Sequence, residues 1–144
     1  MEKGLNLSKI AEKVSDIKES LETLKEYAKR QDEVFLNNKE AIGAARYSFI
    51  VMIEAATNIA NHICARLLNK VPSTYSEAFL LLGESGLIER ELAINLAQMA
   101  KFRNLLVHGY GKIDDKRMLK IMREDLVDVE NFLRSLGELI KSKS

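Results

Sequence analysis

Apolar residues recur every three or four positions along the first part of the chain, and charged or polar residues fill the positions between them. This period predicts an amphipathic α-helix, because residues three and four apart share one helix face. The pattern begins between Leu5 and Ser8 and continues toward Leu36, which predicts one rod of about 45 Å at about 1.5 Å per residue. The apolar and small positions of this stripe are Leu7, Ile10, Val14, Ile17, Leu21, Leu24 and Ala28.

A second stripe with the same period lies between the Asn37-Asn38 pair and Asn69. We expect it to form a second long helix that packs antiparallel against the first. Pro72 lies in the loop that follows, because proline cannot continue the hydrogen-bond ladder of a helix. The stripe consists of Ile42, Ala45, Phe49, Met52, Ala56, Ile59, Ile63 and Leu67.

The rest of the chain predicts three further helices. A short one over about 76–82 is stopped by the Gly83–Gly86 segment, and a fourth over about 88–107 is ended by Gly109 and Gly111. The fifth has Asp114 or Asp115 as its N-cap, and its apolar positions are Met118, Met122, Val129, Phe132, Leu133, Leu136 and Ile140. The fold expected is all-α: an up-and-down bundle of four main helices plus one short helix, in a single domain over 1–144.

Composition limits the class of protein. Hydrophobic residues make up 47% and charged residues 30% of the chain, a globular balance. Cys64 is the only cysteine, which excludes an internal disulfide and a zinc site built from cysteines, and we expect it to be a small core residue. We see no signal peptide, and no apolar stretch reaches the roughly 20 residues that cross a bilayer. A soluble cytoplasmic protein without a membrane partner is expected.

The net charge of +1 does not favour general nucleic-acid binding, but the charge is unevenly distributed. Between Lys101 and Arg123 there are seven basic residues and two acidic ones. This segment is able to bind a phosphate backbone, and the alternative is a solvated helix face. The basic residues are Lys101, Arg103, Lys112, Lys116, Arg117, Lys120 and Arg123.

Arg103 breaks the apolar stripe of the fourth helix, which otherwise runs through Leu92, Leu96, Met99 and Leu106. A guanidinium on an inward face cannot lose its charge, so it requires a carboxylate, a phosphate or a wet cleft. His108 lies five residues further, about 140° around an ideal helix from Arg103, and so the two cannot face one point from a regular helix. Either the helix end unwinds at Gly109, or two chains share the site.

Together these residues have a recognisable chemistry. An imidazole that titrates near neutrality accepts or delivers protons, and a fixed guanidinium stabilises the charge of a transferring phosphoryl group. Such a pair suits metal-free cleavage of RNA, in which the ribose 2′-hydroxyl is the nucleophile and a 2′,3′-cyclic phosphate is the product. The alternative is structural: His108 stabilises the helix C-terminus and Arg103 forms a buried ion pair.

The segment from Met99 to Tyr110, followed by Asp114-Asp115, resembles the signature of the HepT family in the HEPN superfamily. The signature is an arginine, a polar residue, three further residues, a histidine, one residue and a tyrosine. The stretches 72–79 and 54–62 also fit, and the resemblance is weaker before Phe35.

The resemblance implies the toxin of a HepT/MntA toxin–antitoxin pair: a homodimeric, metal-free ribonuclease with no cofactor. Arg103 and His108 would be catalytic and Asn104 supporting. The partner MntA-type nucleotidyltransferase would inactivate the protein by transferring AMP to Tyr110. The alternative implied by other relatives is a non-catalytic helical subunit that binds substrate or partner for a nucleotidyltransferase.

Glu54, Asn58 and His62 are spaced by four, so they share one face of the second helix. We interpret them as a polar seam in which Glu54 or Asn58 orients Arg103, or as a network that only satisfies itself; a metal site here is the less favoured reading. Tyr27, Tyr47 and Tyr75 lie outside any motif, and packing is their default role. A helix-turn-helix DNA binder is a third class of function, but no recognition helix stands out.

Overall fold

The computed structural model describes residues 4–109 and 114–143, and these form helices and connecting segments without β-strands. The all-α prediction is confirmed. The four long helices are α1 (Leu7–Ala28), α3 (Lys39–Ile63), α5 (Arg90–His108) and α7 (Leu126–Lys143). The shorter ones are α2 (Asp32–Leu36), α4 (Tyr75–Glu84) and α6 (Asp115–Glu124), and α3 continues into a π-helical turn, Cys64–Leu68. No helix in the described ranges is long and apolar enough to cross a bilayer.

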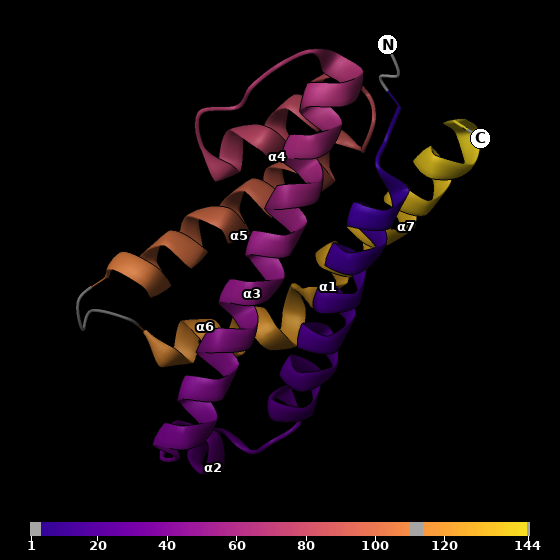
Figure 1. Ribbon diagram of the computed structural model, residues 1–144. Helices are drawn as coiled ribbons and strands as arrows, with labels where there is room; N and C mark the ends of the chain where they lie inside the picture. The colour runs from indigo at the N-terminus through magenta and orange to yellow at the C-terminus, as the bar shows by residue number, and fades with distance from the viewer. Residues whose placement is uncertain (1–3, 110–113, 144) are drawn as a thin grey trace.

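The predicted pairing of the first two long helices is confirmed: α1 and α3 run side by side in opposite directions (Figure 1). Both begin at asparagine caps, because the side chain of Asn6 accepts a hydrogen bond from the Lys9 amide and that of Asn38 from the Ala41 amide. The segment after α3 ends at Asn69, whose φ of 54° is left-handed and stops the helix.

The expected continuous helix to Leu36 is wrong, because α1 ends at Ala28 and a separate α2 follows. Phe35 of α2 is fully buried, and its ring packs 6.1 Å from that of Tyr27. The bend that allows this leaves carbonyls unpaired at the end of α1, and Arg123 of α6 donates to two of them, those of Ala28 and Arg30. The break therefore depends on a residue far away in the sequence.

The predicted fifth helix is also divided, at Asp125, into α6 and α7. The two pieces pack against different partners, since α6 contacts α1 and α7 contacts α5. A straight helix cannot follow both, so the chain bends between them. The structure selects Asp114 as the N-cap of α6: its carboxylate accepts hydrogen bonds from the backbone amides of Lys116 and Arg117.

The predicted stop at the Gly83–Gly86 segment is confirmed, since α4 ends at Glu84 and Gly86 has a left-handed φ of 79°, but Gly83 itself lies in the last turn of the helix. A side chain cannot be accommodated there: an added Cβ would lie 2.5 Å from Cβ of Ala93. The missing side chain thus lets α4 and α5 approach closely. This contact places the first residue of α4, Tyr75, beside the middle of the bundle, where the candidate site is found.

Candidate functional site

Arg103 lies on the inward side of α5, as its place in the apolar stripe predicts. The stripe residues around it are buried, and its own side chain is 11% exposed. Burying a guanidinium is costly unless its charge and donors are satisfied. The surroundings of Arg103 are therefore the centre of the candidate site.

Three side chains hold the Arg103 guanidinium. Nη2 donates to Oε2 of Glu54 on α3 in an ion pair, and Nη1 donates to Oδ1 of Asn104 at 3.0 Å. The ring of Tyr75 stacks against the guanidinium with 4.5 Å between the ring centroid and Cζ. A carboxylate, an amide oxygen and an aromatic face thus fix the plane of the cation.

This arrangement leaves part of the pair open to solvent. The Glu54 side chain is 42% exposed, whereas Arg103 is nearly enclosed. Arg103 Nε is buried and has no hydrogen-bond partner among the residues described, which is uncommon for a buried donor. Glu54 is thus the carboxylate that an arginine on the inward face requires.

Tyr75 has a larger role than the packing role expected from the sequence, because its ring covers the Arg103 guanidinium. Thr74 caps α4 by accepting from the Glu77 amide, and Glu77 in turn accepts from the Ser73 amide at 2.7 Å. This reciprocal capping fixes the helix start and with it the direction of the Tyr75 ring. The sequence signal was the 72–79 stretch of the family resemblance, but only the contact between α4 and α5 shows which cation the ring meets.

His108 is the last residue of α5 and is exposed. The helix is regular through His108, and Gly109 follows as its C-cap with φ of −79° and ψ of 0°. The helical spacing therefore directs His108 and Arg103 to different sides of α5 in one chain. Tyr110 lies outside the described residues.

The polar residues Glu54, Asn58 and His62 on one face of α3 do not form one cluster in the structure. Glu54 binds Arg103, while Nε2 of His62 accepts a hydrogen bond from the Asn6 amide at the start of α1. Asn58 is exposed between them. In the described part of the chain, no three histidine, cysteine, aspartate or glutamate side chains gather as metal ligands. The seam thus contributes one residue, Glu54, to the surroundings of Arg103.

The His62 contact makes stability depend on pH. Burial, then the charges of Arg66 and Lys9, lower the pKa of His62 below its usual 6.5. The unfolded chain therefore binds a proton there more readily, and stability falls as the pH drops through about 6.5. We expect urea unfolding midpoints to fall more for the wild type than for His62→Gln between about pH 7.5 and about pH 5.5. Equal losses in the two proteins would contradict this prediction.

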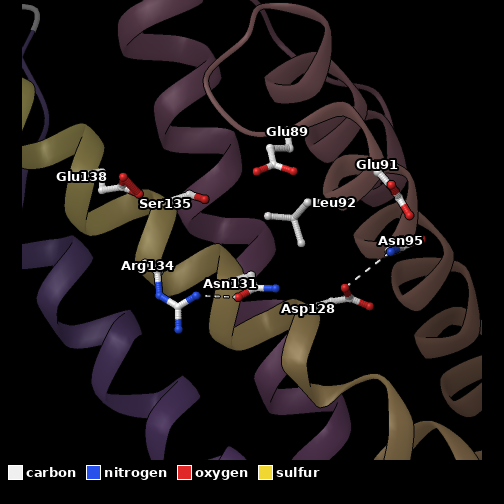
Figure 2. Close-up of a pocket in the computed structure, with 9 residues that line it drawn as sticks. All are labelled: Glu89, Glu91, Leu92, Asn95, Asp128, Asn131, Arg134, Ser135 and Glu138. Carbon is white, nitrogen blue, oxygen red and sulfur yellow. Dashed lines mark hydrogen bonds between the residues drawn. The ribbon is translucent and has the colours of Figure 1, made fainter.

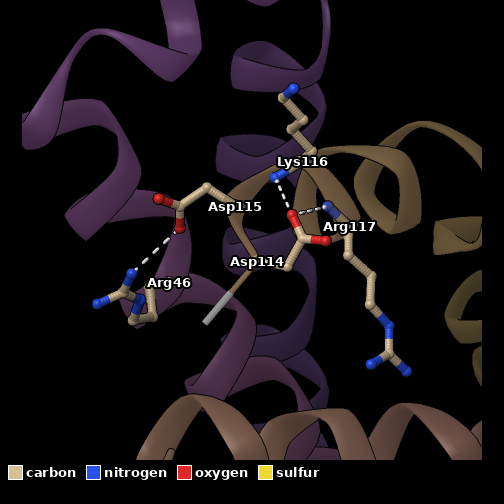
Figure 3. A network of polar contacts seen from close by, with 5 residues as sticks. All are labelled: Arg46, Asp114, Asp115, Lys116 and Arg117. Atoms are coloured by element: carbon tan, nitrogen blue, oxygen red, sulfur yellow. Dashed lines mark hydrogen bonds and ion pairs between the residues drawn. The ribbon is translucent and has the colours of Figure 1, made fainter. Parts of the chain in front are cut away.

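A second polar network lies where α6 begins (Figure 3). Arg46 of α3 donates to Oδ1 of Asp115 at 3.2 Å, beside the Asp114 cap. This ion pair joins the middle of the bundle to the segment just after residues 110–113. It fixes the start of α6 relative to α3, so the helix that follows the motif is held by both a cap and a tertiary contact.

The remaining candidates are structural. Cys64 is fully buried, its thiol donates to the Ala78 carbonyl at 3.6 Å, and burial raises its pKa, which agrees with the predicted core role. Tyr27 packs against Phe35, whereas Tyr47 is 70% exposed and is not a packing residue. Neither tyrosine contacts the Arg103 cluster.

The sequence of this chain is similar to those of HepT-like ribonucleases. A family model for ribonuclease HepT-like proteins matches residues 17–136. The mRNA nuclease HepT of Shewanella oneidensis is 32% identical over 80 residues, 56% of this chain and 60% of that protein. The tRNA nuclease HepT of Aphanizomenon flos-aquae is 29% identical over 90 residues, 62% of this chain and 61% of that protein. The chain thus spans about three-fifths of the length of these two relatives in the matched regions.

Solved structures share the fold. The tri-AMPylated HEPN toxin of Shewanella oneidensis, in complex with its MNT antitoxin, superposes with a TM-score of 0.84 at 24% identity. The superposition covers 90% of this chain and 97% of the toxin. The helical arrangement around Arg103 therefore occurs in a chain of nearly the same extent.

Proposed function

The chain belongs to the ribonuclease HepT-like family, and we propose that it is a metal-independent endoribonuclease that acts as the toxin of a toxin–antitoxin pair. The observation that carries the proposal is the cluster around Arg103. A guanidinium on the core side of α5 is oriented by Glu54, Asn104 and Tyr75, five residues before the exposed His108. Orientation of this kind is what a phosphate-binding cation in a reaction centre requires.

In the proposed reaction, Arg103 binds the scissile phosphate and stabilises the charge that develops on its oxygens. His108 accepts the proton of the ribose 2′-hydroxyl or protonates the departing 5′-oxygen. The 2′-oxygen attacks phosphorus, the bond to the 5′-oxygen breaks, and a 2′,3′-cyclic phosphate results. Glu54 and Asn104 hold the guanidinium, and Asn58, which is exposed one turn further on α3, is a candidate to contact RNA.

We propose that two copies of the chain complete the site. The regular helix through His108 turns its ring away from Arg103, so one chain does not present both groups to one phosphate without unwinding. A symmetric dimer solves this by pairing Arg103 of one copy with His108 of the other. The residual possibility, unwinding at Gly109, would give a monomer that cleaves RNA at any concentration.

The test of the function is cleavage of total cellular RNA by purified wild-type protein in a chelator, with the product ends analysed. Fragments with 2′,3′-cyclic phosphate are expected. No cleavage by unmodified protein would favour the alternative, a non-catalytic subunit that binds substrate or partner for a nucleotidyltransferase. Messenger and transfer RNA are both candidate substrates, and either places the proposed activity in the cytoplasm.

We further propose that an MntA-type nucleotidyltransferase silences the protein by transferring AMP to Tyr110. The added phosphate brings negative charge to the motif that contains the phosphate-binding arginine, which opposes RNA binding. Tyr110→Phe is expected to gain no AMP mass with the partner and ATP and to inhibit growth even when the partner is expressed. Tyr47→Phe removes a hydroxyl from a tyrosine that is 70% exposed and should still be silenced. AMP on the Tyr110→Phe protein would place the modification elsewhere.

A further inference from the structure

A groove of about 370 Å³ lies between α5 and α6, separate from the Arg103 cluster. Its walls include Gln98 and Phe102 from α5 and Arg117 and Lys120 from α6. Met99 and Ile121 add apolar surface between them. The groove therefore places exposed cations and an exposed amide over a buried apolar floor, and its positive charge is the feature that suits a nucleic-acid backbone.

Arg117 is held in position at the edge of this groove. Its guanidinium lies 4.9 Å from the ring centroid of Phe102, and Phe102 is itself fixed by an edge-on contact with Phe49. The Asp114 cap secures the backbone of Arg117 at the start of α6, as Figure 3 shows. A cation placed in this way loses little further side-chain freedom when it binds an anion.

Neither Arg117 nor Lys120 has a carboxylate partner in the part of the chain that the structure describes. Both side chains are exposed. Arg123 on the same helix is different, because it binds Asp32 and caps α1. Two of the basic residues that the sequence singled out are thus free to meet a phosphate.

The other end of the groove has the opposite charge. Asp125 and Asp128 line it there, and Asn95 donates to Asp128 at 3.4 Å. Asn95 and Asp128 also line the adjoining acidic cavity between α5 and α7, which Figure 2 shows with Glu91 beside them. A polyanion would therefore be held at the Arg117 end and repelled at the far end, so the groove suits a short stretch of strand.

We propose that Arg117 and Lys120 form a subsite for a backbone phosphate of single-stranded RNA beyond the cleavage site, with the attached nucleotide against the exposed Gln98. The inference rests on the proposed ribonuclease function. Phe102, which supports Arg117, is adjacent to Arg103 and about 9 Å along the helix axis from His108. Consecutive residues are turned by about 100° on a helix, so the subsite lies on the face of α5 next to that of Arg103 and would hold RNA that extends past the cleavage site.

The test compares RNA binding by a double variant and its parent. Both carry His108→Ala to prevent cleavage, and the variant adds Arg117→Gln and Lys120→Gln. The matched control adds Lys18→Gln and Lys70→Gln, which remove two exposed charges elsewhere. The probe is a labelled single-stranded RNA of about 12 nucleotides, titrated at several salt concentrations. Thermal unfolding by circular dichroism verifies that each protein is folded.

We expect about tenfold weaker binding by the double variant, because both cationic contacts to the phosphate are lost. The slope of log affinity against log salt should decrease in magnitude by about 0.7, the contribution of one neutralised phosphate of a single strand. The control should retain the parent slope. An unchanged affinity and slope in a folded double variant overturns the subsite while the parent still binds RNA. If the parent binds no RNA and the wild type cleaves none, the proposed function fails as well.

Discussion

His108→Ala is expected to reduce RNA cleavage by about 10²- to 10⁴-fold, the usual contribution of a positioned general acid or base. The side chain is exposed at the end of α5, so its removal costs the core nothing. Growth inhibition by the expressed protein should be lost, while the thermal unfolding midpoint should change little. Loss of activity without loss of structure is what separates a catalytic histidine from one that only stabilises a helix end.

The assay measures initial rates of cleavage on one RNA at fixed protein concentration, with His62→Gln as the matched control. His62 is the other histidine of the chain and contacts the start of α1, away from Arg103. The His62→Gln protein should cleave RNA at nearly the wild-type rate near neutral pH. A His108→Ala protein that remains toxic and cleaves RNA would remove His108 from the mechanism.

Arg103→Lys is expected to lower kcat/KM by about 10²-fold although the charge is kept. The guanidinium contacts Glu54, Asn104 and the Tyr75 ring at the same time, and its planar fork makes this possible. A lysine ammonium is a compact point charge that cannot hold the same three contacts and present donors to a phosphate. We expect the loss mainly in kcat, because the displaced ammonium stabilises the charge that develops on the phosphate in the transition state less well.

The matched control is Arg134→Lys, an arginine on α7 that is exposed and donates to Asn131 at 3.0 Å. It should cleave RNA at the wild-type rate, since its surroundings lie outside the Arg103 cluster. Circular dichroism melts of both variants detect any loss of folding. Wild-type kinetics in Arg103→Lys would show that only charge is needed at this position and would contradict the role of Glu54 and Tyr75 in orienting the cation.

Much of the secondary structure could be predicted because it depends on local chemistry. The 3.6-residue period placed the long helices, and Asn69 and Gly109 marked two of their ends. Period alone could not reveal the break at Asp125, since apolar residues continue with the same spacing through it, whereas the polar run from Lys29 to Glu33 was a local sign of the break after Ala28. These bends arise because Phe35 is buried against α1 and because α6 and α7 pack on different helices.

The candidate site divides in the same way. The sequence by itself determined that Arg103 interrupts an apolar face, because helical geometry fixes which side of α5 it occupies, and that a carboxylate or phosphate must accompany it. Only the tertiary structure decided that Glu54 is that carboxylate and that Tyr75 covers the cation. Those partners come from α3 and α4. The approach of α4 to α5 depends on the close contact between Gly83 and Ala93. The residue spacing within one helix does not predict such a contact between two helices.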